Sequence, residues 1–320
     1  MQQKTNFQGI RTGMHRSEKL RSLKDDMVHN YDLYLMVIPG VIYYLLFKYW
    51  PMYGVQIAFR NYSPGLGIAG SPWVGLKYFE KFVTSFQFGR LMTNTFIISV
   101  YSLLVGFPIP ILLALALNAC ENIRFKKTVQ MVSYAPHFIS VVVLVSMLNV
   151  FFGQSFGLVN NLLAALGKER ILFLGKPQYF RHMYVWSGVW QHMGWNAIIY
   201  ISALSGVSPE LHEAATVEGA TKLQRIRHID IPHILPTAII LLIMNCGNLL
   251  SVGFDKVFLM QNDQNIRHAQ VISTYVYEMG LLKNQTSYST AIGLFNSVIS
   301  LILLTTVNQI SRKISDISLW

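Results

Sequence analysis

Glycine spacing is the first feature of this sequence that could indicate chemistry. Gly65, Gly67 and Gly70 are spaced as in the glycine motif of dinucleotide-binding folds, where a tight backbone approaches a pyrophosphate at the start of a helix. That interpretation requires a strand before the glycines and a helix opening after them. Here the glycines lie between Pro64 and Pro72, with neither pattern around them. We therefore interpret this stretch as a flexible loop and not as a nucleotide site.

Other catalytic and metal-binding patterns are also lacking. His228 and His233 are five positions apart and flank Pro232, which is poor geometry for two ligands of one metal ion. The sequence contains no His-Glu-x-x-His motif, no Gly-x4-Gly-Lys-Ser/Thr phosphate-binding loop and no distinctive set of Ser, His and Asp. We therefore expect no catalytic residue, no metal and no cofactor bound by this chain.

Amide and aromatic side chains inside the apolar stretches are more informative. Polar groups in hydrocarbon are costly unless they are paired or face a cavity. Aromatic faces stack on the C–H surfaces of sugars and amides bond hydroxyls, so this combination suits a sugar better than an ion. Alternatively, the same side chains make the interhelical hydrogen bonds that hold a bundle together. The candidates for a substrate pathway are Asn94, Trp190, Gln191, Trp195, Asn196, Tyr200, Asn245 and Asn248.

The composition places these side chains in a membrane. The chain has 320 residues, of which 52% are hydrophobic and only 13% are charged, whereas a soluble globular protein has about 25% charged residues. The bilayer is therefore the expected solvent. The formal net charge of +11 does not indicate nucleic-acid binding, because the basic residues are scattered and form no continuous stripe. It fits cytoplasmic loops next to anionic lipid instead.

The N-terminal residues 1–30 differ from the rest of the chain. They contain several Lys and Arg residues but no apolar segment of the kind found in a signal peptide. We predict a polar cytoplasmic tail over 1–30, followed by one membrane domain over 31–320. Cys120 and Cys246 are isolated from each other in the sequence, and they indicate neither a disulfide framework nor a metal site.

Six stretches are apolar enough to be membrane-spanning helices, which need about 20 mostly apolar residues. Prolines are expected to bend or break the second stretch, at Pro108 and Pro110. An even number of spans places both termini on one side of the membrane, and basic residues in the loop at 124–127 and in the C-terminal tail indicate the cytoplasm. The predicted spans are 33–50 with a continuation to 59, 91–119, 129–152, 183–204, 235–252 and 290–307, with a shorter interfacial helix at 158–166.

One polar stretch, residues 208–232, lies between the fourth and fifth spans. Ala214 and Ala215 favour a helix with a small, smooth surface, and Gly219 permits a turn or a close backbone approach. A second short helix with three basic residues is predicted over 221–228. We interpret the stretch as a helix–turn–helix at the membrane surface, acidic first and then basic, which a partner could contact closely. An ordinary solvated loop is the alternative.

This stretch resembles the EAA motif of the permease subunits of bacterial ABC importers. The family pattern is Glu-Ala-Ala, three residues, Gly, nine residues and then Ile-x-Leu-Pro, and in this chain Ile231 stands where Leu is usual. Two further segments, 51–59 and 73–79, resemble the sugar-importer branch, and the similarity covers roughly residues 30–320. The resemblance implies that contacts with an ATPase are made by Glu213, Ala214, Ala215, Gly219, Ile229 and Pro232.

The resemblance implies an all-α, polytopic fold of about six transmembrane helices, as in the transmembrane domain of a type I ABC importer, with a cytoplasmic coupling loop at 208–232. It implies a transport subunit without catalytic activity in the bacterial cytoplasmic (inner) membrane, with both termini in the cytoplasm. This subunit would form half of the pathway for a sugar, an oligosaccharide or a polysaccharide fragment. The implied partners are a second homologous permease subunit in a heterodimer, two ATPase subunits that use ATP and Mg²⁺, and an extracytoplasmic solute-binding protein.

Other function classes remain as alternatives. An ion-gradient-driven secondary transporter of small polar solutes would need buried acidic residues in mid-span, but Asp32, Glu121 and Asp255 lie at span ends. A membrane enzyme would need a convergent catalytic set, and a receptor or scaffold would need no ATPase. The charge of the sugar also stays open. Basic residues of the predicted external loops, such as Arg181 and Arg267, suit an acidic oligosaccharide, a binding protein or lipid headgroups.

Overall fold

The computed structural model describes residues 29–315 and 317–319. The tail predicted over 1–30 therefore lies outside the described residues, apart from its last two positions. In the described part of the chain every extended regular element is a helix, and an isolated β-bridge pairs Arg60 with Trp73. The predicted all-α class is confirmed. The chain divides into two compact units, Met1–Gln56 and Ile57–Trp320, each of which is described by itself.

The described part of the first unit is an apolar helix. It contains α2 (Tyr31–Tyr44), the π-helical turn η1 (Leu45–Tyr49) and most of the 3-10 helix η2 (Trp50–Phe59). These elements form a run of 29 residues, which is long enough to cross a bilayer. No residue of α2 or η1 is buried. Such a helix suits hydrocarbon, because lipid can cover its side chains while its backbone groups are bonded within the helix.

The second unit starts with two short helices, α3 (Gly67–Gly70) and α4 (Lys77–Val83), and then a long one. The long helix consists of α5 (Phe86–Gly106) and α6 (Pro108–Asn118), which together form a 33-residue apolar run. The break expected at the prolines is absent. Phe107 keeps a right-handed helical conformation, and both prolines fall in the first turns of α6, where φ is suitable for proline.

The third predicted span, 129–152, is wrong as a single straight helix. The chain forms α7 (Ile123–Tyr134), the 3-10 turn η3 (Ala135–Phe138) and α8 (Val141–Phe152), and the two halves are bent by 102°. Ile139 and Ser140 are extended and separate the halves. Ser140 starts α8 as its N-cap, because its hydroxyl accepts a hydrogen bond from the backbone N–H of Val143 at 3.3 Å.

The helix α10 (Pro177–Leu204) follows the short helix α9 (Leu158–Ala165) and is central to the second unit. It packs against α5, α6, α7 and the later helix α13. Its residues Ala197, Tyr200 and Leu204 form a buried cluster with Leu115 of α6 and Ile234 of α13. The helix has 28 residues, yet it is not among the runs apolar enough to qualify as a span, because polar side chains interrupt its sequence.

After α10 the chain forms α11 (Pro209–Val217) and then a second long run: α12 (Lys222–Arg225), the π-turn η4 (Ile226–Asp230) and α13 (Ile231–Gly247). This run has 26 residues, so the fifth span begins before position 235 and ends before 252. Pro232 falls in the first turn of α13, where proline is tolerated, so it does not interrupt the run. The N–H of Ile231 bonds the carbonyl of Ile226, one residue further back than in an α-helix.

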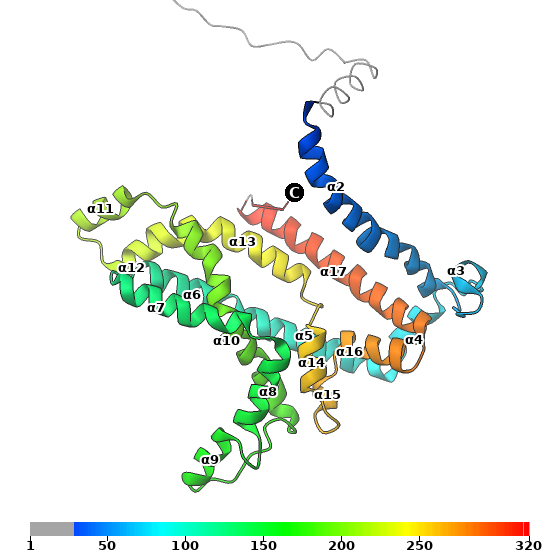
Figure 1. Ribbon diagram of the computed structural model, residues 1–320. Coiled ribbons are helices and arrows are strands. Elements are labelled where there is room, and N and C mark those ends of the chain that lie inside the picture. The colour runs from blue at the N-terminus through cyan, green and yellow to red at the C-terminus, as the bar shows by residue number, and fades with distance from the viewer. Residues whose placement is uncertain (1–28, 316, 320) are drawn as a thin grey trace, which may run out of the picture. The chain divides into compact units, whose positions relative to one another are not determined.

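The remaining elements are α14 (Phe254–Met260), α15 (Ile266–Ala269), α16 (Ile272–Tyr277), the π-turn η5 (Glu278–Leu282) and α17 (Thr286–Ser315). α17 packs along α13, and α11 and α12 lie at one extremity of this unit (Figure 1). Among the described residues, four runs are apolar and long enough to span a membrane, and the bent pair α7–α8 would make five. The polar helix α10 accounts for the remaining predicted span.

Close packing between α7 and α10 can be tested at Gly194. A Cβ atom at this position would overlap the backbone carbonyl group of Ser133. We expect Gly194→Ala to destabilise the protein by about 1–3 kcal/mol, the usual cost of overpacking. Gly293→Ala in α17 is the matched control, since nothing lies within 4 Å of its added Cβ. Thermal unfolding in detergent measures the difference, and equal stability of the two variants would contradict the contact.

Candidate functional site

The polar stretch between α10 and α13 contains a helix with a well-defined end. α11 has Pro209 in its first turn and ends before Gly219, whose φ is 81°. The N–H of Gly219 donates to the carbonyl of Thr216 at 3.0 Å, and the N–H of Ala220 donates to that of Ala215 at 2.9 Å. This pair of bonds is a Schellman cap, which favours glycine at its left-handed position. Gly219 thus reverses the chain between α11 and α12.

Side-chain hydrogen bonds hold α12 against α11. Thr221 and Gln224 form a capping box at the start of α12. Arg225 Nη1 donates to the hydroxyl of Thr216 at 2.9 Å, and this hydroxyl donates to the carbonyl of His212 at 2.7 Å. The two short helices are therefore connected through their side chains as well as through the glycine turn.

A buried carboxylate connects this pair of helices to the rest of the unit. Asp230 in η4 is only 2% exposed, and its Oδ1 lies 3.3 Å from both His212 Nε2 and Asn118 Nδ2. His212 belongs to α11 and Asn118 ends α6, so three elements meet at one carboxylate. A buried carboxylate without partners would be costly. Asp230 was not among the candidate residues predicted from the sequence, although an acidic residue between Ile229 and Ile231 is a usable signal.

The predicted coupling residues lie on two different elements. Glu213 and Ala214 are exposed on α11 and Ala215 is half-buried. None of the ion pairs found in the described part of the chain includes Glu213. Ile229 is half-buried in η4, and Pro232 is exposed in the first turn of α13. The Glu-Ala-Ala segment is thus available to a partner, whereas Ile229 and Pro232 lie where the helix enters the bundle.

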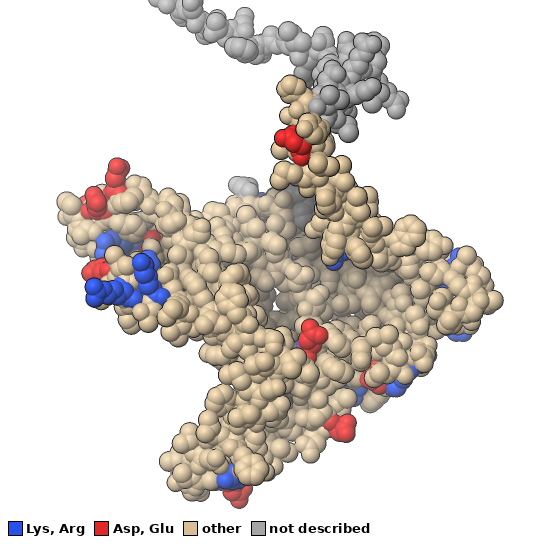
Figure 2. All heavy atoms as spheres, in the orientation of Figure 1, with Lys and Arg blue, Asp and Glu red and all other residues tan. Residues whose placement is uncertain are grey.

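Exposed apolar side chains surround the Glu-Ala-Ala segment. Leu211 is 55% exposed, Val217 89% and Leu223 74%. Beside them, Lys222 Nζ pairs with Glu121 Oε1 at 2.7 Å, and this hydrogen bond and charge lower the pKa of Glu121. Figure 2 shows charged side chains gathered over α11 and α12, next to helices that are mostly uncharged. Apolar side chains rimmed by charge are typical of a protein–protein contact.

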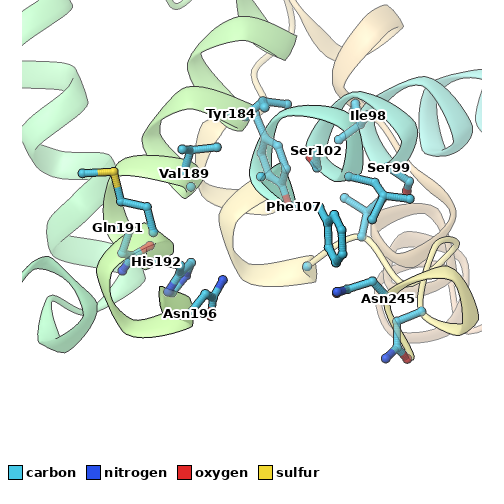
Figure 3. A pocket seen from close by; sticks show the side chains of 18 of the residues that line it. Ile98, Ser99, Ser102, Phe107, Tyr184, Val189, Gln191, His192, Asn196 and Asn245 are labelled. Atoms are coloured by element: carbon cyan, nitrogen blue, oxygen red, sulfur yellow. The ribbon is translucent and has the colours of Figure 1, made fainter. Parts of the chain in front are cut away.

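A cavity of about 620 Å³ lies in the second unit between α5, α6, α10, the end of α13 and α14. This volume is within the range of small-molecule sites, roughly 300–1,000 Å³. Figure 3 shows His192 and Asn196 of α10 on one side of it and Asn245 of α13 on another. Five of the predicted pathway residues line this cavity: Gln191, Asn196, Tyr200, Asn245 and Asn248.

The amides in the lining differ in how they are used. Asn196, Asn245 and Asn248 are exposed. Asn245 and Asn248 donate to carbonyls one turn earlier in α13, at 2.9 and 3.2 Å, and no hydrogen bond among the described residues uses their amide oxygens. Gln191 is only 3% exposed, and its amide donates to the carbonyl of Ile139 at 2.8 Å. Gln191 therefore also holds α10 against the bend between η3 and α8.

Lys256 of α14 contributes a basic side chain to the lining of the cavity. It is the one Lys or Arg among the lining residues, and it is 8% exposed. Its Nζ donates to the carbonyl of Tyr184 at 2.8 Å and lies 4.8 Å from the centre of the Tyr184 ring. α14 lies outside the membrane-spanning runs. Burial lowers the pKa of Lys256 to about 7, because desolvation disfavours the charged form. In the sequence this residue falls in a predicted external loop, and it was not among the candidate pathway residues.

The other three predicted pathway residues lie elsewhere. Asn94 is 3% exposed and makes three hydrogen bonds to Arg181 and to the backbone near α15. Trp195 stacks on His137, with ring centroids 4.3 Å apart. Trp190 lines a smaller apolar pocket of about 310 Å³. None of these three is part of the cavity lining.

Known proteins share the fold of this chain. The family model of the binding-protein-dependent transport system inner membrane component matches residues 106–316. This range contains α11 and most of the helices that line the cavity. It covers more than half of the chain.

Individual relatives match over nearly the whole length. The chain is 42% identical over 301 residues to the polygalacturonan/rhamnogalacturonan transport system permease protein YteP of Bacillus subtilis (strain 168), which covers 94% of each chain. It is 39% identical, with a TM-score of 0.85, to a chain in the crystal structure of a bacterial ABC transporter involved in the import of the acidic polysaccharide alginate, covering 92% of this chain and 99% of that one.

A second structure, of the bacterial alginate ABC transporter in complex with an alginate pentasaccharide-bound periplasmic protein, matches with a TM-score of 0.84 and 38% identity, over 92% of this chain and 99% of that one. The type I importer fold expected from the EAA motif is thereby confirmed, and the matches are to transport subunits and not to enzymes. The chain therefore belongs to the family of binding-protein-dependent transport system inner membrane components, as a membrane-embedded carbohydrate permease subunit of an ABC importer.

Proposed function

We propose that the cavity is this chain's half of the translocation pathway for an oligosaccharide, and that movement of α11 opens and closes it. One observation carries the proposal: the cavity and the coupling loop are built on the same two helices. α10 lines the cavity with Asn196 and Tyr200 and leads into α11. The run from α12 to α13 leads back and lines the cavity with Asn245. A displacement of α11 is therefore transmitted to two walls of the cavity.

ATP supplies this displacement through a separate subunit. We infer that α11 docks in a groove of an ATPase, with Glu213 as the charged anchor, Ala214 and Ala215 as the closely packed face and Gly219 as the turn. Closure of the ATPase pair would bring the two coupling helices of the transporter together and rotate the spans as rigid bodies, and hydrolysis would reset them. In this scheme ATP and Mg²⁺ are held by the ATPase, and this chain holds no cofactor.

We further propose a complex with a second, homologous permease chain as a heterodimer, two ATPase subunits and an extracytoplasmic solute-binding protein. The family description and the alginate transporter captured with its periplasmic protein support the last of these partners. The basic residues Arg312 and Lys313 in the last turn of α17 favour a cytoplasmic C-terminus in the inner membrane. The N-terminus would lie on the same side.

We infer that the substrate is an acidic oligosaccharide. Exposed amides such as Asn196 and Asn245 can bond sugar hydroxyls, and Lys256 can bond a carboxylate through a charge-assisted hydrogen bond. A carboxylate would also favour the charged form of Lys256, which burial disfavours. The relatives support this substrate class, because one is named for polygalacturonan and rhamnogalacturonan and another imports the acidic polysaccharide alginate.

Docking of α11 can be tested at Ala215, the half-buried last residue of the Glu-Ala-Ala segment. We expect Ala215→Asp to reduce oligosaccharide uptake by more than about tenfold, because an unpaired charge in a closely packed interface costs several kcal/mol. Ala215→Ser adds little volume and no charge, so it should retain uptake. Uptake into cells or liposomes is measured together with the amount of ATPase that co-purifies. Normal uptake and normal ATPase recovery for Ala215→Asp would refute the docking site.

The role of the cavity can be tested with its exposed amides. We expect Asn196→Leu and Asn245→Leu each to raise the KM for uptake about three- to tenfold, since a net hydrogen bond contributes about 0.5–1.5 kcal/mol. Thr305→Val in α17 is the control, because its hydroxyl bonds only carbonyls of its own helix in the described structure and does not line the cavity. Unchanged KM values in both Leu variants would show that the substrate does not contact this cavity.

A further inference from the structure

Four basic side chains gather where α5, α10 and α15 meet, one helical turn beyond the cavity. They are Arg90 on α5, Arg181 on α10, and Arg267 and His268 on α15, and are termed here the arginine cluster. Asn94 and Gln270 connect them. Asn94 Nδ2 donates to the backbone carbonyls of Arg267 and Gln270 at 3.0 Å each, and Asn94 Oδ1 accepts from Arg181 Nη2 at 3.0 Å. Arg90 Nη2 donates to Gln270 Oε1 at 2.8 Å.

The positive charge of the cluster is not neutralised by the described part of the chain. Glu278 is the acid that reaches this network, but its Oε1 pairs with Lys283 at 2.6 Å and its Oε2 accepts from Gln270 Nε2 at 2.7 Å. None of the ion pairs among the described residues includes Arg90, Arg181 or Arg267. Three guanidinium groups thus lie together with one carboxylate, which another cation already uses.

The cluster also contains nitrogen atoms that are buried without a hydrogen-bond partner in the described structure: Arg90 Nε, Arg181 Nε and His268 Nδ1. Burial lowers the pKa of Arg181. The pKa of His268 is lowered by burial first, and then by the charges of Arg181 and Arg267. The Nε–H groups of Arg90 and Arg181 are thus buried donors without acceptors, and both such donors and unbalanced charges are unfavourable. A bound anion would supply the missing acceptors and the compensating charge.

The cluster lies next to the cavity on the side away from the coupling loop. Arg181 precedes the cavity-lining Tyr184 by three residues, and Asn94 precedes the cavity-lining Ile98 by four, which is about one helical turn in each case. The coupling loop follows the opposite, C-terminal end of α10. Lys256 Nζ bonds the carbonyl of Tyr184, so the next cation lies within one turn of Arg181 along α10.

We propose that the arginine cluster is a carboxylate-binding site that receives the uronic acid groups of the oligosaccharide before they reach Lys256 in the cavity. This inference rests on the proposed function, because it assigns a site outside the cavity to the same substrate. Guanidinium groups match carboxylates in geometry and form strong, charge-assisted hydrogen bonds with them. The arginine cluster and Lys256 place cations one after the other beside α10, which suits a ligand with carboxylates on several sugar units. A neutral oligosaccharide has no carboxylate for these cations to bind.

The test uses the complete transporter with its solute-binding protein, reconstituted in liposomes. Import of trigalacturonate is compared with import of the same trisaccharide after reduction of its carboxyl groups to alcohols. The variants are Arg181→Gln, which can keep the bond to Asn94, and Arg267→Gln, whose side chain is exposed. Lys77→Gln is the matched control, because it removes one exposed positive charge from α4, outside the cluster.

We expect Arg181→Gln and Arg267→Gln each to raise the KM for trigalacturonate about tenfold, the loss that one charge-assisted hydrogen bond represents. Import of the reduced trisaccharide and the basal ATPase rate should stay unchanged, and Lys77→Gln should resemble the unmodified transporter. Salt should weaken trigalacturonate import less in the variants than in the unmodified transporter, because part of the electrostatic attraction is already lost.

Four results would overturn this assignment. Equal losses for both trisaccharides would mean that the cluster only braces the helices. A loss that disappears at saturating solute-binding protein would mean that the cluster contacts that protein and not the sugar. Unchanged trigalacturonate import in both variants would exclude the site while leaving the acidic substrate intact. If the unmodified transporter imports only the reduced trisaccharide, the proposed substrate class fails, and the cluster's role fails with it.

Discussion

The connection between the surface helix α11 and the rest of the second unit depends on the buried carboxylate of Asp230. It contacts His212 of α11 and Asn118 at the end of α6, and it lies in the turn that opens the long run into α13. Force applied to a surface helix is useful only if that helix cannot move independently of the bundle. The Schellman cap at Gly219 and the hydrogen bonds between Arg225, Thr216 and His212 also restrict the movement of α11 relative to α12. α11 is therefore connected through Asp230 to α6 and α13, and the displacement that we propose for α11 would reach the walls of the cavity that these helices form.

Polar side chains in the membrane domain serve two different purposes, and the bonding of each one distinguishes them. Hydrocarbon offers no hydrogen bonds, so a polar group there either finds a protein partner or faces a polar space. Asn94 and Gln191 use their amides to join separate elements. Asn196 and Asn245 are exposed in the cavity lining instead. The basic side chains also form two groups. Lys222 forms an ion pair with Glu121, whereas Lys256 and the arginine cluster form no ion pair with an acidic residue among the described residues.

Much of the fold was predictable because it rests on local signals. The apolar runs, the short helix α9 and the helical Glu-Ala-Ala segment ending at a glycine turn all follow from composition and from the propensities of a few residues. The errors occurred at prolines. Pro108 and Pro110 were expected to bend or break the second span, but they fall in the first turns of α6, where proline is tolerated, and the run is not broken there. Around Pro136 an apparently continuous span bends by 102°, because Ser140 caps a new helix. Whether a proline breaks a helix depends on where the helix starts, and the neighbouring packing decides that.

The sequence by itself determined the all-α membrane fold and the position of the helical Glu-Ala-Ala segment between two long helices. These properties follow from hydropathy and short-range spacing, which do not require knowledge of distant contacts. Only the tertiary structure decided which amides share a cavity, that Asp230 connects α6 with α11, and that Arg90, Arg181 and Arg267 approach one another. Each of these depends on helices that are far apart in the chain but adjacent in space. Their mutual rotation sets which face of each helix is buried, and no local pattern specifies that rotation.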